Sequence, residues 1–310
     1  MYINRLKSTR RIRAIIGSFL RARRYIKILS KLNKVLFLTL FMGVDYRKHL
    51  RNVKKTLEMR ALLFGADLTY VSGWPSSYSE SYDCLLTGRQ NYLFTWDYEV
   101  FKRVSKKIAV RHGKNLKTFL ESKRIKELGI RKDKISYKLY QKLSRKTRLI
   151  DISEELKKIR SVKDTEEIKA IKKACSYADK AMGVAMEVVR EGVSERKVRN
   201  EILHAVMDEC ESIAFEPIVA SGRNSLYIHI LPEKKKIKKA ETVIVDIGFK
   251  VNNYCSDLSR TFIVKPSKKQ KELYEKVLEA QNVAMDLAYP GVKASEISKA
   301  VDDFFQKQRP

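Results

Sequence analysis

The sequence predicts an α/β protein of two domains, and three observations support this fold class. The first is length, because 310 residues are enough for two domains that each bury a core. The second is a series of short apolar runs separated by turn residues over residues 45–150, which predicts a small mixed α/β domain. The third is a long helical pattern within residues 151–310, followed by further strand-like runs.

Residues 1–44 form a basic extension with eleven Lys and Arg residues and no acidic residue. Its apolar run, residues 35–44, is half the length of a membrane-spanning helix, which needs about 20 residues. An Arg-rich leader suggests a targeting peptide, but the basic region is long for a secretory signal and no Ala-x-Ala-like cleavage site follows. We expect translation to start at Met42, with the preceding residues mis-assigned or disordered.

The formal net charge of +29 raises the question of nucleic-acid or membrane binding. Outside the extension the basic excess is spread along the chain, which is typical of a solvated surface, so we expect no specific nucleic acid and no membrane as partner. The cysteines include no C-x-x-C pair, which predicts neither a disulfide framework nor a thiolate zinc site and fits a reducing cytoplasm. They are Cys84, Cys175, Cys210 and Cys255.

The elements of residues 45–150 follow from the spacing of their apolar residues. A helix is expected at residues 49–59, and two basic helices are expected near residues 115–128 and 134–143. The four residues Gly88-Arg89-Gln90-Asn91 lie between two apolar runs and predict a hairpin turn. Strands are expected at residues 61–65, 68–72, 83–88, 91–95 and 107–110.

A long helix is expected to begin at Asp164 or Thr165, because either residue suits an N-cap and acidic residues follow in the first turn. Beyond it, the segment around Gly192 resembles the segment around Gly291, and each predicts a helix, a Gly-Val turn and a second helix. This pattern is common enough for chance to explain it. Strand-like runs follow the first copy, whereas the second copy is followed by the last residue, Pro310.

Two aspartates in neighbouring strands carry the strongest chemical signal. Asp246 interrupts a continuous apolar run, residues 242–248, which is typical of a strand buried on both faces, where an unpaired carboxylate is costly. Asp257 lies in the next expected strand, and a turn at residues 251–253 would place the carboxylates opposite each other, with Cβ atoms about 4.5–5.5 Å apart. A shared proton or shared metal ions would relieve their repulsion, and two metal ions suit hard oxygen ligands at this spacing.

Each of these residues also has an ordinary structural interpretation. Asp257 at the end of a strand would face solvent or pair with Arg260. His229 lies in an apolar run, residues 226–231, where a lone histidine is more often a buried core residue than a catalytic one. Its position just before the aspartate strands is what makes it a candidate.

Residues 215–264 resemble the central block of the Xaa-Pro aminopeptidase, prolidase and creatinase superfamily, and they read FEPIVASGRNSLYIHILPEKKKIKKAETVIVDIGFKVNNYCSDLSRTFIV. The likeness extends over residues 150–310 and, more vaguely, over residues 45–150. It implies an α/β architecture with a creatinase/prolidase-like N-terminal domain at residues 45–150. Residues 151–310 would then be the first half, and the start of the second half, of a pita-bread metallopeptidase domain.

The resemblance also implies site residues and chemistry. Asp246 and Asp257 match the family's metal-bridging or chelating aspartates, and His229 matches a histidine that assists substrate or transition-state binding. Members hold two divalent ions, most often manganese or cobalt, with zinc a further candidate, and a hydroxide between them attacks the carbonyl before proline. Their substrates are short peptides with proline at the second position, and many members are homodimers. Ile230 departs from the family pattern, because a second histidine or polar residue often stands there.

The family's remaining ligands, a histidine in a Gly-His-Gly-like turn and two glutamates, have no match after Asp303. We therefore expect a C-terminally truncated chain that is inactive alone and that exposes a sheet edge and an apolar face. Two other functions remain open. Methionine aminopeptidase shares the aspartate spacing, and a non-catalytic pita-bread module would bind peptides or a protein partner.

Overall fold

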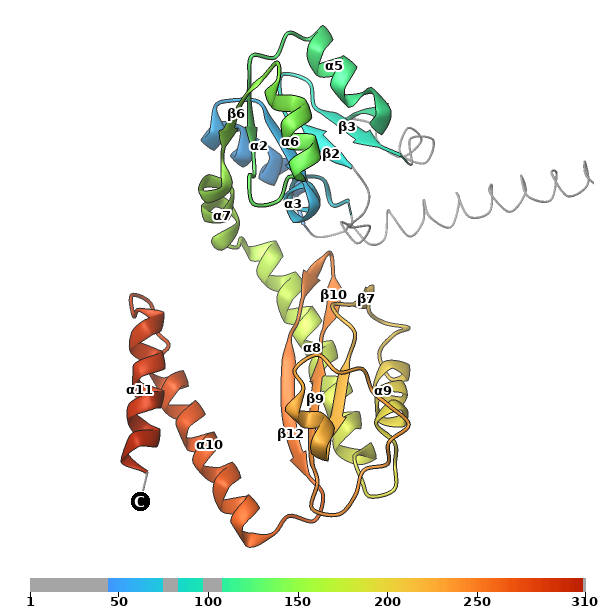
Figure 1. The fold of residues 1–310 in the computed structure, drawn as a ribbon, viewed down its shortest axis with the longest axis vertical. Coiled ribbons are helices and arrows are strands. Elements are labelled where there is room, and N and C mark those ends of the chain that lie inside the picture. Colours follow the sequence, from blue (N-terminus) through green and yellow to red (C-terminus); the bar gives the residue numbers. More distant parts are fainter. Residues whose placement is uncertain (1–43, 75–82, 97–107, 309–310) are drawn as a thin grey trace, which may run out of the picture. The chain divides into compact units, whose positions relative to one another are not determined.

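A computed structural model describes residues 44–74, 83–96 and 108–308 (Figure 1). The chain divides into two units, one made of residues up to 174 together with 250–256, the other of residues 175–249 and 257–310. Apart from Val44, the basic extension and its expected start at Met42 lie outside the described residues. Within the described ranges, no helix combines the length and the apolar character needed to cross a bilayer.

The first unit is built on a mixed sheet of six strands. Along the chain they are β1 (Ala61–Phe64), β2 (Cys84–Leu86), β3 (Tyr92–Thr95), β4 (Ala109–His112), β5 (Glu127–Ile130) and β6 (Arg148–Asp151). Their order in the sheet is β4-β3-β2-β1-β5-β6. The central strand β1 pairs antiparallel with β2 and parallel with β5.

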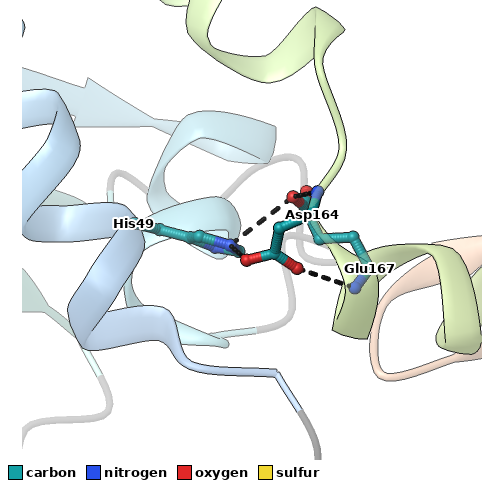
Figure 2. Close-up of side chains that lie close together, drawn as sticks. All are labelled: His49, Asp164 and Glu167. Carbon is teal, nitrogen blue, oxygen red and sulfur yellow. Dashed lines mark hydrogen bonds and ion pairs between the residues drawn. The ribbon is translucent and has the colours of Figure 1, made fainter.

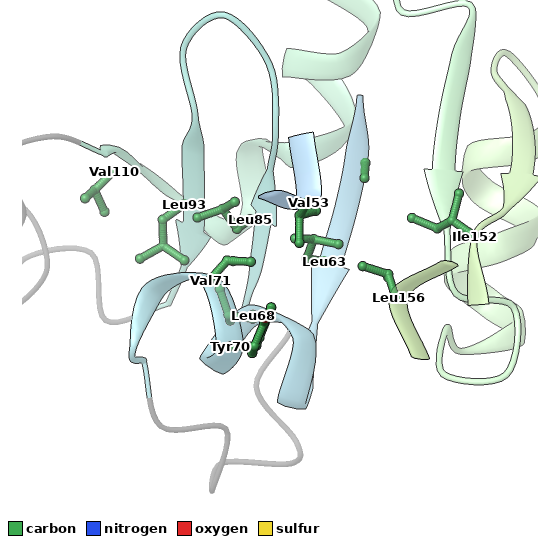
Figure 3. Packing of buried hydrophobic residues seen from close by; sticks show 11 residues of the cluster. Val53, Leu63, Leu68, Tyr70, Val71, Leu85, Leu93, Val110, Ile152 and Leu156 are labelled. Carbon is green, nitrogen blue, oxygen red and sulfur yellow. The ribbon is translucent and has the colours of Figure 1, made fainter. Parts of the chain in front are cut away.

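Helices cover both faces of this sheet, and neighbouring residues of a strand therefore pack in different core clusters. Leu63 packs in one cluster with side chains from α2 (Tyr46–Leu57), α3 (Gly65–Ser72) and α7 (Ser153–Ser161), as Figure 3 shows. Leu62 enters the other cluster, together with residues of α5 (Leu116–Ser122) and α6 (Tyr137–Ser144). Successive side chains of β1 point to opposite faces of the sheet, so each face of the sheet has its own core cluster.

Two expectations for this unit are wrong. Residues 68–72, expected as a strand, belong to α3, because a short apolar run of fully buried residues does not distinguish a strand from a helix. The single helix expected near residues 115–128 is instead the short helix α5, a reversal at Arg124 with φ of +47°, and the strand β5. The hairpin turn expected at Gly88-Arg89-Gln90-Asn91 is confirmed, because β2 and β3 pair antiparallel around it.

The long helix expected after Asp164 is α8 (Thr165–Val188). The Asp164 side chain accepts hydrogen bonds from the backbone N–H groups of Glu166 and Glu167, both at 3.0 Å. The Glu167 carboxylate in turn accepts from the Asp164 N–H at 2.7 Å, which completes a reciprocal cap. The predicted start of this helix is confirmed.

The second unit contains an antiparallel sheet in the order β12-β9-β8. Its strands are β8 (Ile218–Ser221), β9 (Thr242–Ile247) and β12 (Leu258–Ile263), and helix α9 (Glu195–His204) packs against β8. A short strand, β7 (Ser212–Ile213), precedes β8. Two short hairpin strands, β10 (Phe249–Val251) and β11 (Tyr254–Cys255), come between β9 and β12 in the sequence. Residues 250–256 of this hairpin belong to the first unit.

The expected helical repeat is present in the fold. The first copy runs from α8 through a turn at Gly192 to α9, and the second runs from α10 (Lys268–Asp286) through a turn at Gly291 to α11 (Ala294–Lys307). Both glycines have positive φ, +84° and +99°, a backbone conformation that residues with a side chain rarely adopt. The second copy exposes a group of large apolar side chains, namely Leu273, Tyr274, Val277, Leu278, Met285 and Phe305.

Candidate metal centre

Asp246 and Asp257 lie on either side of a tight hairpin whose turn is Asn252-Asn253. Both asparagines have positive φ, +50° and +65°, as the two central residues of a type I′ turn require. The flanking residues pair as Lys250 with Cys255 and Val251 with Tyr254. The turn is therefore centred between residues 252 and 253.

This turn changes the expected pairing of the two aspartates. Asp246 is opposite Ser259 in the β9–β12 ladder, and Asp257 directly precedes the first residue of β12. The prediction that Asp246 and Asp257 lie directly opposite each other is wrong, because the turn is centred one position later than that register requires. In a regular antiparallel ladder Asp257 is instead the diagonal neighbour of Asp246, and the two residues lie about 7–8 Å apart, with their Cβ atoms somewhat closer.

Asp246 lies on the more open face of its strand. Along β9, Val243, Val245 and Ile247 are buried, whereas the alternate residues, including Asp246, are only half-buried. The expectation of a strand buried on both faces is therefore wrong, and Asp246 keeps access to solvent. Ser259 donates a hydrogen bond from Oγ to Asp246 Oδ1 at 2.7 Å, which fixes the carboxylate on the sheet.

Asp257 is exposed, and its carboxylate is available to a ligand. Among the described residues no ion pair joins it to Arg260, whose guanidinium donates to the Ser259 carbonyl at 2.8 Å. The pairing of Asp257 with Arg260 is therefore not seen, while its exposure agrees with the alternative of a solvent-facing residue. Asp246 and Asp257 together offer hard carboxylate oxygens at one end of a sheet, a donor set that fits divalent cations such as manganese.

His229 is exposed, so its interpretation as a buried core histidine is wrong. It follows a short 3-10 helix, Gly222–Leu226, and its apolar neighbours are open to solvent, with Leu226 77% and Ile228 81% exposed. Residues 226–230 line a shallow hollow on the surface. An exposed imidazole among apolar side chains suits contact with a bound peptide better than a role in the core.

A buried network that the sequence did not reveal anchors the segment that carries His229. The Glu195 carboxylate, fully buried at the start of α9, accepts from Ser221 N and Ser221 Oγ, both at 2.7 Å. It also accepts from Asn224 Nδ2 and from the Glu233 N–H, each at 3.1 Å. Glu195 therefore ties both ends of the loop between residues 221 and 233 to α9.

An ion pair between Lys235 and Glu241 extends this network. Lys235 Nζ donates to Ser221 Oγ at 2.7 Å and to Glu241 Oε2 at 2.8 Å. Burial acts to raise the pKa of Glu241 and is the largest single influence on it, but the hydrogen bonds from Lys235 and from the Lys238 N–H, together with the charges of both lysines, outweigh burial and hold that pKa below its ordinary value. Gly222 has φ of +52°, and a Cβ there would collide with the Glu241 side chain, so the loop favours glycine at this position.

Two family models match the chain in succession. The Creatinase/Prolidase N-terminal domain matches residues 47–162, and Metallopeptidase family M24 matches residues 169–309. The Xaa-Pro dipeptidase of Pyrococcus horikoshii is 34% identical over 252 residues, which cover 79% of this chain and 71% of the relative. The Xaa-Pro dipeptidase of Pyrococcus furiosus is also 34% identical, and the match covers 70% of this chain and 63% of the relative.

Solved structures of prolidases have a fold similar to that of this chain. The prolidase from Pyrococcus horikoshii superposes with a TM-score of 0.73 at 30% identity, covering 86% of this chain and 78% of the other. The prolidase from Pyrococcus furiosus gives a TM-score of 0.71 at 30% identity, covering 83% and 78%. The X-Pro aminopeptidase from Thermotoga maritima, at 24% identity and a TM-score of 0.75 over 85% of this chain and 78% of the other, shares the fold.

Proposed function

This chain belongs to the pita-bread metallopeptidases of family M24 that carry a creatinase/prolidase N-terminal domain, and we propose that it acts as an Xaa-Pro aminopeptidase or dipeptidase. Its proposed substrates are short peptides with proline at the second position. The observation that supports this most is Asp246, a half-buried carboxylate fixed by Ser259 on β9, with Asp257 exposed just before β12. Two such oxygen ligands, separated by a tight hairpin, suit a shared metal centre.

In this proposal Asp246 and Asp257 hold two divalent ions, with manganese or cobalt preferred and zinc a further candidate. When bound, such ions lower the pKa of a water molecule and polarise the scissile carbonyl. Ser259 occupies one oxygen of Asp246 by its hydrogen bond, so the other oxygen would be the one to bind a metal ion. His229, exposed on the loop held by Glu195, is proposed to donate a hydrogen bond to the peptide near the scissile bond.

The proposal also covers the roles of the two domains, the localisation and the oligomeric state. Residues 45–150 are proposed to restrict the site to short peptides, residues 151–310 to form the metallopeptidase part, and the whole protein to act as a cytoplasmic homodimer. The chain spans 63% of the Pyrococcus furiosus dipeptidase that it matches.

Manganese binding tests the proposal without relying on activity. Mn²⁺ would be titrated into the chain and followed by electron paramagnetic resonance of the free ion. Weak binding is expected, and Asp246→Asn or Asp257→Asn should lower the affinity by at least about tenfold, as lost carboxylate ligands do. Asp179→Asn, at an exposed position of α8, is the matched control and should leave the affinity unchanged.

Two results would contradict the proposal. Equal Mn²⁺ affinity in Asp246→Asn and in the unmodified chain would remove Asp246 from the site. Absence of any Mn²⁺ binding would favour a non-catalytic module that binds peptides or a protein. If peptidase activity is found, cleavage of Xaa-Pro dipeptides but not of Met-Ala would support the proposal, whereas the reverse preference would indicate a methionine aminopeptidase.

A further inference from the structure

A second group of metal-ligating side chains belongs to the first unit, whereas Asp246 and Asp257 belong to the second. His49 projects from α2 toward Asp164 and Glu167 at the start of α8 (Figure 2). One potential ligand atom from each side chain lies within 4.8 Å of the other two. His49 is 1% exposed and Glu167 is 2% exposed, so these two side chains are shielded from solvent.

The tautomer of His49 is set by its surroundings. Its Nδ1 lies 2.9 Å from the backbone carbonyl of Tyr70, which only accepts hydrogen bonds, so Nδ1 carries a proton. The ring also stacks on Tyr70 with centroids 4.2 Å apart, which fixes its plane. Nε2 therefore faces the two carboxylates, and this is the arrangement in which metal-binding histidines donate their other ring N–H to a carbonyl.

The distances around Nε2 match a metal site better than hydrogen bonds. Nε2 lies 3.5 Å from Asp164 Oδ2 and 3.6 Å from Glu167 Oε2, and it is a buried nitrogen without a hydrogen-bond partner in the described part of the chain. A charged N–H to a carboxylate would bring the atoms to about 2.7–2.9 Å. Ligands at about 2.0–2.2 Å from one tetrahedral zinc ion lie about 3.4 Å apart.

Both carboxylates are already held in position. Asp164 Oδ1 accepts the two backbone N–H groups of the helix cap, and Tyr254 donates its hydroxyl to Glu167 Oε1 at 2.7 Å. The oxygens that face His49 are Asp164 Oδ2 and Glu167 Oε2. Prior fixation of ligands by surrounding hydrogen bonds reduces the ordering cost of binding a metal ion.

From this geometry we propose that His49, Asp164 and Glu167 form a divalent cation site that joins α2 to the start of α8, with zinc as the best-matched ion. One imidazole and two carboxylates are ligands that zinc accepts, and water would complete a tetrahedral set. The site is independent of the proposed peptidase centre. Its effect is to stabilise the first unit.

Lys48 competes with the cation for one ligand. Its Nζ lies 2.8 Å from Asp164 Oδ2, and its side chain is 48% exposed, so it can turn away into solvent when a metal ion binds. Lys48→Ala removes this competing charge while leaving the three ligands in place. The variant should therefore bind zinc more tightly than the parent chain, because like charges close together repel.

The test uses the full chain carrying Asp246→Asn and Asp257→Asn, so that failure of the peptidase proposal does not affect the outcome. Zinc would be titrated against a fluorescent zinc indicator, and one equivalent should bind. His49→Gln and Glu167→Gln should each lower the affinity by at least about tenfold. Glu166→Gln, the same change one residue earlier on an exposed side chain, should not.

Absorption spectroscopy at the zinc edge should show nitrogen and oxygen neighbours. Three results would overturn the proposal: no zinc bound by the double variant, zinc bound through sulfur of an exposed cysteine, or affinity that does not rise in Lys48→Ala. The absence of zinc binding would mean that His49, Asp164 and Glu167 are only a structural cluster. Because Lys48 is on the surface, its variant decides the question even if His49→Gln fails to fold.

Discussion

Removal of the Glu195 carboxylate should destabilise the second unit strongly. Glu195 is fully buried and accepts two hydrogen bonds from Ser221, a residue that is itself fully buried. Glu195→Ala would leave both Ser221 donors without this acceptor, at about 1–3 kcal/mol each, so the expected loss is about 2–6 kcal/mol. The bonds from Asn224 and from the Glu233 N–H should contribute less, because those residues are not fully buried and can reach water.

Urea unfolding followed by far-ultraviolet circular dichroism measures this loss. Glu201→Ala, an exposed glutamate on the same helix, is the matched control and should change stability by less than about 0.5 kcal/mol. Trp74 and Trp96, the two tryptophans of the chain, both belong to the first unit, so the fluorescence transition should move less than the dichroism transition. Equal stability of Glu195→Ala and Glu201→Ala would refute the reasoning.

Three further predictions concern other parts of the fold. Asp67→Asn should cost about 1.5–3 kcal/mol in urea unfolding, because it removes the charged partner whose Oδ2 lies 3.2 Å from the buried guanidinium of Arg131, while Asp133 remains as a counter-charge; a loss below about 1 kcal/mol would contradict this. The two hydrogen bonds from Arg131 lower the pKa of Asp133 from 3.8 to about 2, so Asp133 stabilises the fold above pH 4 and this contribution is lost as the pH falls from about 4 to 2. Acid titrations of Asp133→Asn should lack that part of the decline, and an unchanged profile would show that the pair contributes nothing. Gly222→Ala should lower the melting temperature more than Gly291→Ala, because both positions need positive φ but only at Gly222 would the new Cβ collide with another side chain, that of Glu241. Equal losses would show that contact to be unimportant.

Signals that depend on one residue and its near neighbours were predictable from the sequence. Asp164 marks the start of α8 because its short carboxylate accepts the free N–H groups of the first turn. Gly192 and Gly291 mark the two turns of the helical repeat because both positions need positive φ. These features follow from local chemistry, so no knowledge of the tertiary fold was necessary.

The register of the aspartate hairpin was harder to predict. A turn near residues 251–253 was expected, but pairing shifts completely when the centre of a turn moves by one residue. The adjacent Asn252 and Asn253 were the available signal, because asparagine tolerates the positive φ that both central positions of a type I′ turn need. With that turn type assigned, Ser259 would have been identified as the residue opposite Asp246.

Contacts between distant parts of the sequence left no local pattern. His49 and Asp164 are separated by more than a hundred residues, and nothing around either residue indicates the other. Glu195 reads as an ordinary acidic residue in the first turn of a helix, although its side chain is buried among donors from the loop at residues 221–233. His229 was ambiguous for a related reason, because an apolar run has the same composition whether it lies in a core or on the surface.

The most direct test of the metal assignment is anomalous diffraction from crystals of this chain grown with a high concentration of Mn²⁺. If Asp246 and Asp257 share divalent cations, an anomalous peak should lie within coordination distance of carboxylate oxygens from both residues. Manganese at neither aspartate, or at one of them with the other turned away, would contradict the shared centre on which the peptidase proposal depends.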